Sequence, residues 1–374
     1  MKLSKNKKIV YSVLIVALIL LLLYKIPTLA RYKTRVNSSG DVWNGMVASS
    51  YRSGTGTSNN PYIISNGDEL AFFSSQLENN NYEGKYFKIS NDILLNGGSF
   101  KYENDTLVYI LNGNTYYLNG NDYYASSDFS GEKVGTLNSF PSLKNFKGTL
   151  DGDYHVIYGY YSDKALFKNL NGNVSSLYIE NAAVKSSSSA SIFADTITDS
   201  TIANVVVDGY LISNNYVVSE DEPVIADVVS NYEELDKSVL GSIAIYAKDS
   251  SLVNCINKAS IKGGYISSGL VGYSDGTSII NSYNTGNITA YNSNAIGVFT
   301  GSGIVDRVYN SGTINNALIG YVIDSELEIN NSFITTNNYL VSYTADSTIT
   351  GSNNYYTGQD KGTNVTSTQV TTNN

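Results

Sequence analysis

Apolar and polar residues alternate along three consecutive stretches, and the alternation repeats about every 26 residues. The stretches are 251–277, 278–303 and 304–322. Alternation with a period of two is typical of a strand that has one buried and one solvated face. The residues that share the buried parity are Val253, Cys255, Asn257, Ala259 and Ile261, then Ile280, Ser282, Asn284, Gly286 and Ile288, then Val308, Asn310, Gly312 and Ile314.

Each stretch continues into a second apolar segment, at 269–273, 295–299 and 318–321. Matching strands at a fixed period must lie parallel in neighbouring rows, because each row can bury its apolar face only against the next. A β-propeller needs about four strands in 40–45 residues, which these rows do not supply. The pattern therefore predicts an all-β fold, a single-stranded right-handed parallel β-helix with about 22–27 residues per row.

Three motifs bear a family resemblance: Gly-Leu-Val-Gly at 269–272, Asn-Thr-Gly-Asn-Ile at 284–288, and the segment 146–157. The chain resembles GLUG-motif bacterial surface proteins, adhesin-like members of the broad pectin-lyase-like class, over roughly residues 41–356. Its rows are also similar to the β-helical regions of IgA-protease-type chains. It departs from the pattern because one row alone keeps the full glycine motif. The resemblance implies export and a cell-surface location, and it implies no single activity.

The N-terminus reads as a membrane-targeting segment. Residues 2–8 are rich in lysine and residues 9–24 are almost wholly apolar. Sixteen apolar residues fall between the core of a signal peptide and a full membrane span. We expect 1–30 to be a cytoplasmic basic segment followed by a signal-anchor helix, with the β-helix outside the cell. The alternative is a secreted chain, cleaved near Ala30.

The rest of the chain divides by composition. Residues 31–60 read as a linker, and 61–356 as the β-helix, with insertions at 99–140 and 212–238 that break the period. Residues 67–78 have capping-box spacing and an apolar stripe, so we expect a helix that covers the N-terminal end of the solenoid. Residues 357–374 read as a disordered tail.

Charge and rare residues exclude several functions. The net charge is −9, and residues 1–35 carry eight basic and no acidic side chains, so the remainder carries −17. A body this acidic repels phosphate backbones, so we expect no nucleic-acid partner. His155 is the single histidine and Cys255 the single cysteine. Zinc sites built on two histidines and a disulfide framework are therefore excluded, and no metal or cofactor is expected.

Polysaccharide cleavage is the enzymatic alternative, either hydrolysis or lyase chemistry. A hydrolase needs two carboxylates on neighbouring strands, and Asp151 and Asp153 are the best sequence pair. Arg307 is the candidate base of a lyase. The segment Asp151-Gly152-Asp153 also reads as a turn, which is the commoner use of these residues. We therefore expect no enzyme activity. Acids and a base gathered in an open groove on the helix wall would favour the enzyme.

Tyrosine is the other chemical signal, since the chain has 32. Exposed rings bind sugars or proteins, although tyrosine also packs well on strand surfaces. The candidate ligand-binding residues are Tyr116, Tyr117, Tyr123 and Tyr124 in the first insertion, and Tyr283 and Tyr309 on the rows. Asn257, Asn284 and Asn310 share the buried parity and predict a structural amide ladder.

These observations predict a cell-surface, membrane-anchored or secreted adhesin-like binding protein with no catalytic role. Its ligand would be a glycan or a surface protein. The insertions would bind it, and the rigid β-helix would present them. A β-helical polysaccharide lyase or glycoside hydrolase is the alternative, and a purely structural spacer is a third.

Overall fold

The computed structural model describes residues 41–213, 238–334, 339–352 and 354–356. The chain divides into two compact units, Met1–Asp41 and Val42–Asn374, and the described helix and strands belong to the second. The predicted anchor, the residues 214–237 of the second insertion and the predicted disordered tail lie outside the described residues. Within the described part, no helix is long and apolar enough to cross a membrane.

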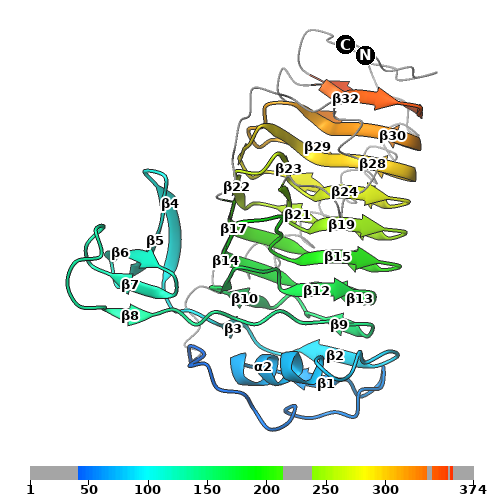
Figure 1. Cartoon of the computed structure of the whole chain (residues 1–374). Coiled ribbons are helices and arrows are strands. Elements are labelled where there is room, and N and C mark those ends of the chain that lie inside the picture. Colours follow the sequence, from blue (N-terminus) through cyan, green and yellow to red (C-terminus); the bar gives the residue numbers. More distant parts are fainter. Residues whose placement is uncertain (1–40, 214–237, 335–338, 353, 357–374) are drawn as a thin grey trace, which may run out of the picture. The chain divides into compact units, whose positions relative to one another are not determined.

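The chain forms a parallel β-solenoid, which confirms the predicted all-β fold class. Successive rows lie above one another, as Figure 1 shows from α2 to β32. One large sheet contains β1 (Tyr62–Ile64), β2 (Tyr86–Ile89), β9 (Thr149–Asp151), β12 (Phe167–Leu170), β13 (Asn173–Ser175), β15 (Ala194–Thr198), β16 (Thr201–Ala203), β18 (Val239–Gly241), β19 (Ala244–Lys248), β20 (Ser251–Val253), β23 (Ile266–Ser268), β24 (Val271–Asp275), β25 (Ser278–Ile280), β28 (Asn292–Asp306), β30 (Ala317–Asn330), β32 (Tyr339–Ala345) and β33 (Thr348–Ser352).

A second parallel sheet forms the other wall. It contains β3 (Ile93–Leu94), β10 (Val156–Tyr158), β11 (Tyr161–Ser162), β14 (Tyr178–Ser186), β17 (Val206–Ser213), β21 (Ile256–Asn257), β22 (Ser260–Lys262), β26 (Tyr283–Asn284), β27 (Ile288–Thr289), β29 (Tyr309–Asn310), β31 (Phe333–Ile334) and β34 (Tyr355–Tyr356). Side chains that point inward between the two sheets make one continuous apolar core.

Turns between the two sheets shift the alternation of buried and exposed residues. Part of the predicted buried series is therefore wrong. Asn254 and Asn281 adopt left-handed backbone angles, with φ of 55° and 49°. Left-handed backbone angles bend the chain, and asparagine adopts them more readily than most residues. The inward residues before these turns are therefore Leu252 and Ile279, both 0% exposed, in place of the predicted Val253 and Ile280.

The helix α2 (Gly67–Gln76) covers the N-terminal end, close to the predicted 67–78. Asn66 caps its start by accepting from the backbone amide of Glu69, and the Glu69 carboxylate accepts in turn from Ser65. Phe73 of the helix packs on Phe87 of the first complete row, with ring centroids 4.5 Å apart. The helix therefore covers the apolar side of the first row, which has no earlier row to pack against.

Part of the predicted linker, from residue 42 onward, contacts the solenoid. Trp43 is 7% exposed, packs against Phe140 at 5.2 Å and donates its backbone amide to Leu94. The backbone at Ser53 accepts from Ile63, so this segment also lines strand β1. The polar composition of 44–60 gave no indication of these contacts, because a single tryptophan and a few backbone hydrogen bonds hold the segment in place.

The first insertion forms a separate antiparallel sheet on one side of the rows (Figure 1). Its strands are β4 (Ser99–Glu103), β5 (Thr106–Leu111), β6 (Asn114–Asn119), β7 (Asp122–Tyr124) and β8 (Gly135–Thr136). Asn112 and Gly113 have φ of 52° and 80° and form the two-residue hairpin loop that this dipeptide predicts. Phe140 already belongs to the main core, so the insertion ends before the predicted residue 140.

Candidate functional site

The insertion sheet is docked firmly on the helix wall. The ring of Phe100 stacks on Tyr161 of β11, with centroids 5.5 Å apart and planes 19° apart. Asn181 accepts from the backbone amide of Phe100 at 2.8 Å and donates to the carbonyl of Gly98 at 2.9 Å. These contacts lie in a buried apolar cluster of both layers. Because both sides are fixed, any hollow between them is preformed.

A salt bridge holds the far end of the insertion. Lys262 of β22 pairs with Asp105 and lies 4.7 Å from the ring centroid of Tyr102. Lys262 and Asp105 are both more than one-third exposed, so the pair contributes little to stability. It joins the turn between β4 and β5 to β22 of the wall.

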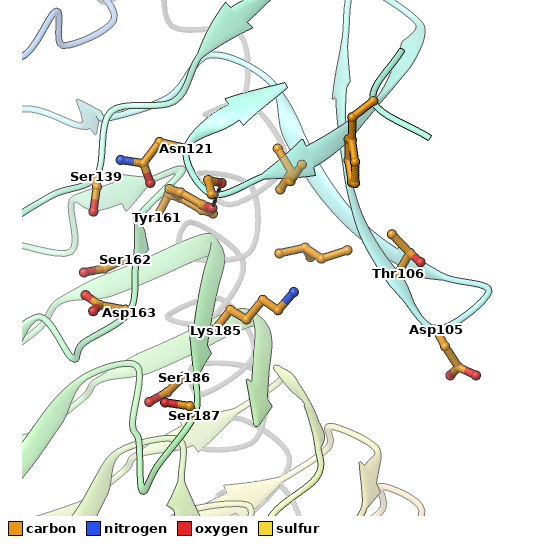
Figure 2. A pocket seen from close by; sticks show the side chains of 14 residues that line it. Asp105, Thr106, Asn121, Ser139, Tyr161, Ser162, Asp163, Lys185, Ser186 and Ser187 are labelled. Carbon is orange, nitrogen blue, oxygen red and sulfur yellow. Dashed lines mark hydrogen bonds between the residues drawn. The ribbon is translucent and has the colours of Figure 1, made fainter. Parts of the chain in front are cut away.

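A cleft of about 620 Å³ lies between the insertion and the wall. Its lining residues are Asp105, Thr106, Leu107, Leu118, Gly120, Asn121 and Phe129 from the insertion, and Ser139, Tyr161, Ser162, Asp163, Lys185, Ser186 and Ser187 from or beside the wall. Figure 2 shows Lys185 extending from the wall toward the strand that carries Thr106. The walls of the cleft therefore come from segments far apart in the sequence.

The cleft mixes apolar surface with hydroxyl and amide groups. Tyr161 donates its hydroxyl to the carbonyl of Gly120 at 2.6 Å, which fixes the orientation of its ring. Burial raises the pKa of this hydroxyl, so it stays a donor at neutral pH. Serine, threonine and asparagine side chains also line the cleft, with Lys185 and Asp163 as charged groups. Such a lining can contact an apolar face and bind several hydroxyls at once.

A second hollow of about 540 Å³ adjoins the cleft, since Ser139, Ser162 and Asp163 line both. The other residues that line it are Glu78, Phe140, Pro141, Ser142, Lys144, Lys164, Lys168 and Asp195. Lys144 pairs with Glu78 at 2.7 Å. Two carboxylates, Asp163 and Asp195, and two further lysines therefore remain in one open hollow.

Asp195 is the unusual acid of this hollow. Burial raises its pKa to about 6, although Lys168 and the backbone amide of Ala165 favour the charged form. The register places Asp195 level with Lys168 of the neighbouring row. A carboxyl group that titrates near neutral pH can hold or release a proton under ordinary conditions.

The four tyrosines predicted in the insertion lie in its sheet and do not line the cleft. The rings of Tyr116 and Tyr123 are 5.2 Å apart, while Tyr117 and Tyr124 are cross-strand partners. All four are half-buried. Their ligand-binding role stays a prediction, and the contacts already explain them as packing residues.

Tyr283 and Tyr309 belong to an aromatic column on the outer face of the second sheet. The ring of Tyr309 lies parallel to that of Phe333 at 5.5 Å and meets the ring of Tyr283 at 74° and 6.2 Å. The faces of Tyr309 are thus occupied by its neighbours above and below. A sugar would meet ring edges and hydroxyls there, which is a poorer stacking surface than an open face.

The asparagine ladder runs inside the solenoid. Asn257 donates its side-chain amide to Asn284 at 2.7 Å, and Asn284 donates to Asn310 at 2.6 Å. Each amide also reaches the carbonyl two residues further along its own strand. All three residues are 0% exposed, so the ladder is structural.

The remaining chemical candidates have structural roles. Asp151 ends β9, and Asp153 lies in the turn that follows, with φ of 47°, where it pairs with Lys88 at 3.1 Å. Arg307 is a turn residue that pairs with Asp306. His155 contacts Asp92 at 3.0 Å. Cys255 is fully buried, and burial raises the pKa of its thiol to about 12.

Sequence reasoning missed the residues that do line the cleft. They follow no motif, and they meet because the insertion folds back over later rows. The serine run 186–189, directly after an apolar strand, was the clearest available signal. In the described part of the chain, no group of three acidic, histidine or cysteine side chains is arranged to hold a metal ion.

Comparisons with known proteins add little beyond the fold. No protein-family model matches the sequence, and no curated protein matches it. Among solved structures, the chain is similar to a crystal structure named as "a putative immunoglobulin A1 protease from Bacteroides ovatus". The TM-score is 0.44 and the identity 20%, over 82% of this chain and 78% of that chain. A likeness of this strength carries no argument about activity or ligand.

Proposed function

We propose that this protein is a cell-surface binding protein, and that the cleft between the insertion sheet and the helix wall binds a carbohydrate. The observation that carries the proposal is the composition of that cleft. The ring of Phe129, which is 40% exposed, and the buried ring of Tyr161 line the cleft beside a dense set of hydroxyl and amide groups. Sugars have the matching chemistry, because each ring offers an apolar C–H face and a rim of hydroxyls.

The size and rigidity of the cleft support the same proposal. A hollow of about 620 Å³ lies within the range of small-molecule sites. Docking of Phe100 on Tyr161 holds both walls in place before a ligand arrives. A preformed site loses less conformational entropy on binding, which favours ligands with few strong contacts.

Binding is the whole proposed role of the cleft, with no reaction assigned to it. We further propose that residues 9–24 anchor the chain in the membrane and that the β-helix faces outward, as the apolar N-terminal run predicts. Cell fractionation combined with protease treatment of intact cells tests this part. Residues 42–374 should be digested from outside, and a protected β-helix would contradict the proposed location.

Binding is tested with the full chain in detergent against an array of neutral and charged glycans. Hits are then measured by titration with matched variants. Lys185→Ala and Asn121→Ala should weaken binding about tenfold or more, because each removes a polar contact inside the cleft. Lys147→Ala and Asn59→Ala remove the same groups at exposed positions outside the cleft. Equal losses in both pairs, or no glycan hit, would refute the proposal.

Glycoside hydrolysis is a second candidate function, and Asp195 favours it. Its raised pKa suits a proton donor, and Asp163 supplies a second carboxylate in the same hollow. The assay is release of reducing ends from a broad polysaccharide panel. Asp195→Asn should abolish release, while Asp199→Asn, on an exposed turn, should not. Activity that survives Asp195→Asn would exclude this role for the hollow.

A further inference from the structure

The two hollows beside the insertion contain lysines that no acid neutralises directly. Lys164 and Lys168 line the second hollow, and Lys185 lines the cleft. Within the described part of the chain, none of these three lysines makes a salt bridge, whereas Lys144 pairs with Glu78 at 2.7 Å. An ammonium group carries three hydrogen-bond donors, so each of the three lysines can donate to a ligand.

The acids of the two hollows leave a local excess of positive charge. Two of their four carboxylates already have lysine partners, Lys262 and Lys144. The other two, Asp163 and Asp195, face the three lysines, and three less two leaves +1. Burial raises the pKa of Asp195 to about 6, so a fraction of this group stays neutral at pH 7. In a body that is otherwise strongly acidic, this is a place where a negative group is attracted.

The backbone that carries the two lysines of the second hollow is rigid. Lys164 lies in the loop between β11 and β12, where the Tyr160 hydroxyl donates to its carbonyl at 2.8 Å and its amide donates to Ser162 at 3.3 Å. Tyr160 is 0% exposed, so water does not compete for its hydrogen bond. Lys168 follows on β12, level with Asp195 of the next row. Both lysines therefore reach the hollow from fixed positions.

The second hollow continues the cleft, so one ligand can occupy both. Ser139, Ser162 and Asp163 line the cleft of about 620 Å³ and the hollow of about 540 Å³ alike. Figure 2 shows these three residues on the side of the cleft opposite Thr106. A sugar chain bound in the cleft would therefore extend past Asp163 toward Lys164 and Lys168.

We propose that the ligand is an anionic oligosaccharide, and that Lys164 and Lys168 bind its carboxylate or sulfate group in the second hollow. This inference rests on the proposed carbohydrate-binding function and adds the class of sugar to it. Hydrogen bonds from an ammonium group to an anionic oxygen are stronger than those between neutral groups. Asp195 opposes the binding, because its carboxylate attracts the same lysines that the ligand needs.

The experiment measures the affinity of the full chain in detergent for matched pairs of oligosaccharides. One pair is an oligomer that contains glucuronic acid and its carboxyl-reduced form, and the other is a sulfated galactan oligomer and its desulfated form. Each hit from the glycan array is added with its charged or neutral counterpart. The charged member should bind about tenfold or more tightly in at least one pair, and the pair that responds identifies the group that is bound.

The outcomes separate this inference from the function on which it rests. Equal affinities within every pair would overturn the inference and leave carbohydrate binding intact. An array and a panel without any binding would refute the proposed function, and the inference with it.

Variants test whether the second hollow is responsible. Lys164→Gln and Lys168→Gln remove a charge each, and each should lower the ratio of charged to neutral affinity about tenfold. Lys147→Gln removes the same charge at an exposed position that lines neither hollow, and should leave the ratio unchanged. Asp195→Asn should raise the ratio about threefold, because it removes the opposing carboxylate. An unchanged ratio in both hollow variants, an equal loss in Lys147→Gln, or a lower ratio in Asp195→Asn would overturn the inference.

Discussion

Replacing Asn284 by alanine tests how strongly the internal amide ladder holds neighbouring rows together. Asn284 accepts from Asn257 at 2.7 Å, donates to Asn310 at 2.6 Å and donates to the carbonyl of Gly286 at 3.1 Å. Alanine removes all three bonds in a site that is 0% exposed, so water cannot replace them. At about 1 kcal/mol net for each bond, the loss in unfolding free energy is about 3 kcal/mol.

The matched control is Asn287→Ala, in the same row. Asn287 is exposed and its side chain makes one described bond, accepting from the backbone amide of Thr313 at 3.0 Å. Water replaces this bond when the side chain is lost, so we expect a cost of less than about 1 kcal/mol. Urea unfolding of both variants gives the comparison, with an unchanged slope required for each.

A charged variant sharpens the test. Asn284→Asp places a carboxylate in the same buried site, where burial favours the neutral form. The folded-state pKa of this carboxyl should lie above its unfolded value, so the variant should lose stability as pH rises above about 4. If Asn284→Ala costs no more than Asn287→Ala, or Asn284→Asp follows the wild-type pH profile, the ladder does not stabilise the rows.

Three further outcomes follow from the buried groups. The pKa of Asp195 is raised to about 6, so its charge opposes folding as pH rises from about 4 to about 6. Asp195→Asn should remove this dependence and add about 3 kcal/mol of stability at pH 7. Asp199→Asn should do neither, and urea titrations at several pH values give the comparison. Phe100→Ala should cost about 3–5 kcal/mol of the free energy that docks the insertion on the wall. Hydrogen–deuterium exchange should become faster in β4–β8 while the rows stay protected. Slow exchange in β4–β8 would contradict the docking. The Cys255 thiol, with a pKa raised to about 12, should resist alkylation in the native chain and react on unfolding, and rapid native labelling would refute its burial.

The periodic part of the fold was predictable because each row repeats the same physical problem. Inward positions such as Asn284 and Ile288 recur at a fixed spacing, and their burial needs only the next row. The capping helix was also predictable, since Asn66 and Glu69 satisfy its first amides locally. The turn at Asn254 was harder, because one left-handed residue reverses the parity without changing the composition.

The non-periodic contacts could not be predicted in the same way. Trp43 and Phe140 lie 97 residues apart and meet at 5.2 Å through the docking of a polar segment. The cleft depends on Phe100 finding Tyr161, which no spacing in the sequence encodes. The tyrosines of the insertion drew attention to a segment that lines the proposed cleft, but the rings of Tyr116 and Tyr123 pack against each other.

The location of the cleft follows from the geometry of a solenoid. Regular rows give a straight wall, because each residue is repeated one strand spacing above the last. The cleft needs a second layer beside such a wall, and the insertion between β3 and β9 supplies it by folding over later rows. Deletion of residues 99–136 should therefore remove binding while leaving the rows above β14 folded, and binding that survives the deletion would place the ligand on the wall itself.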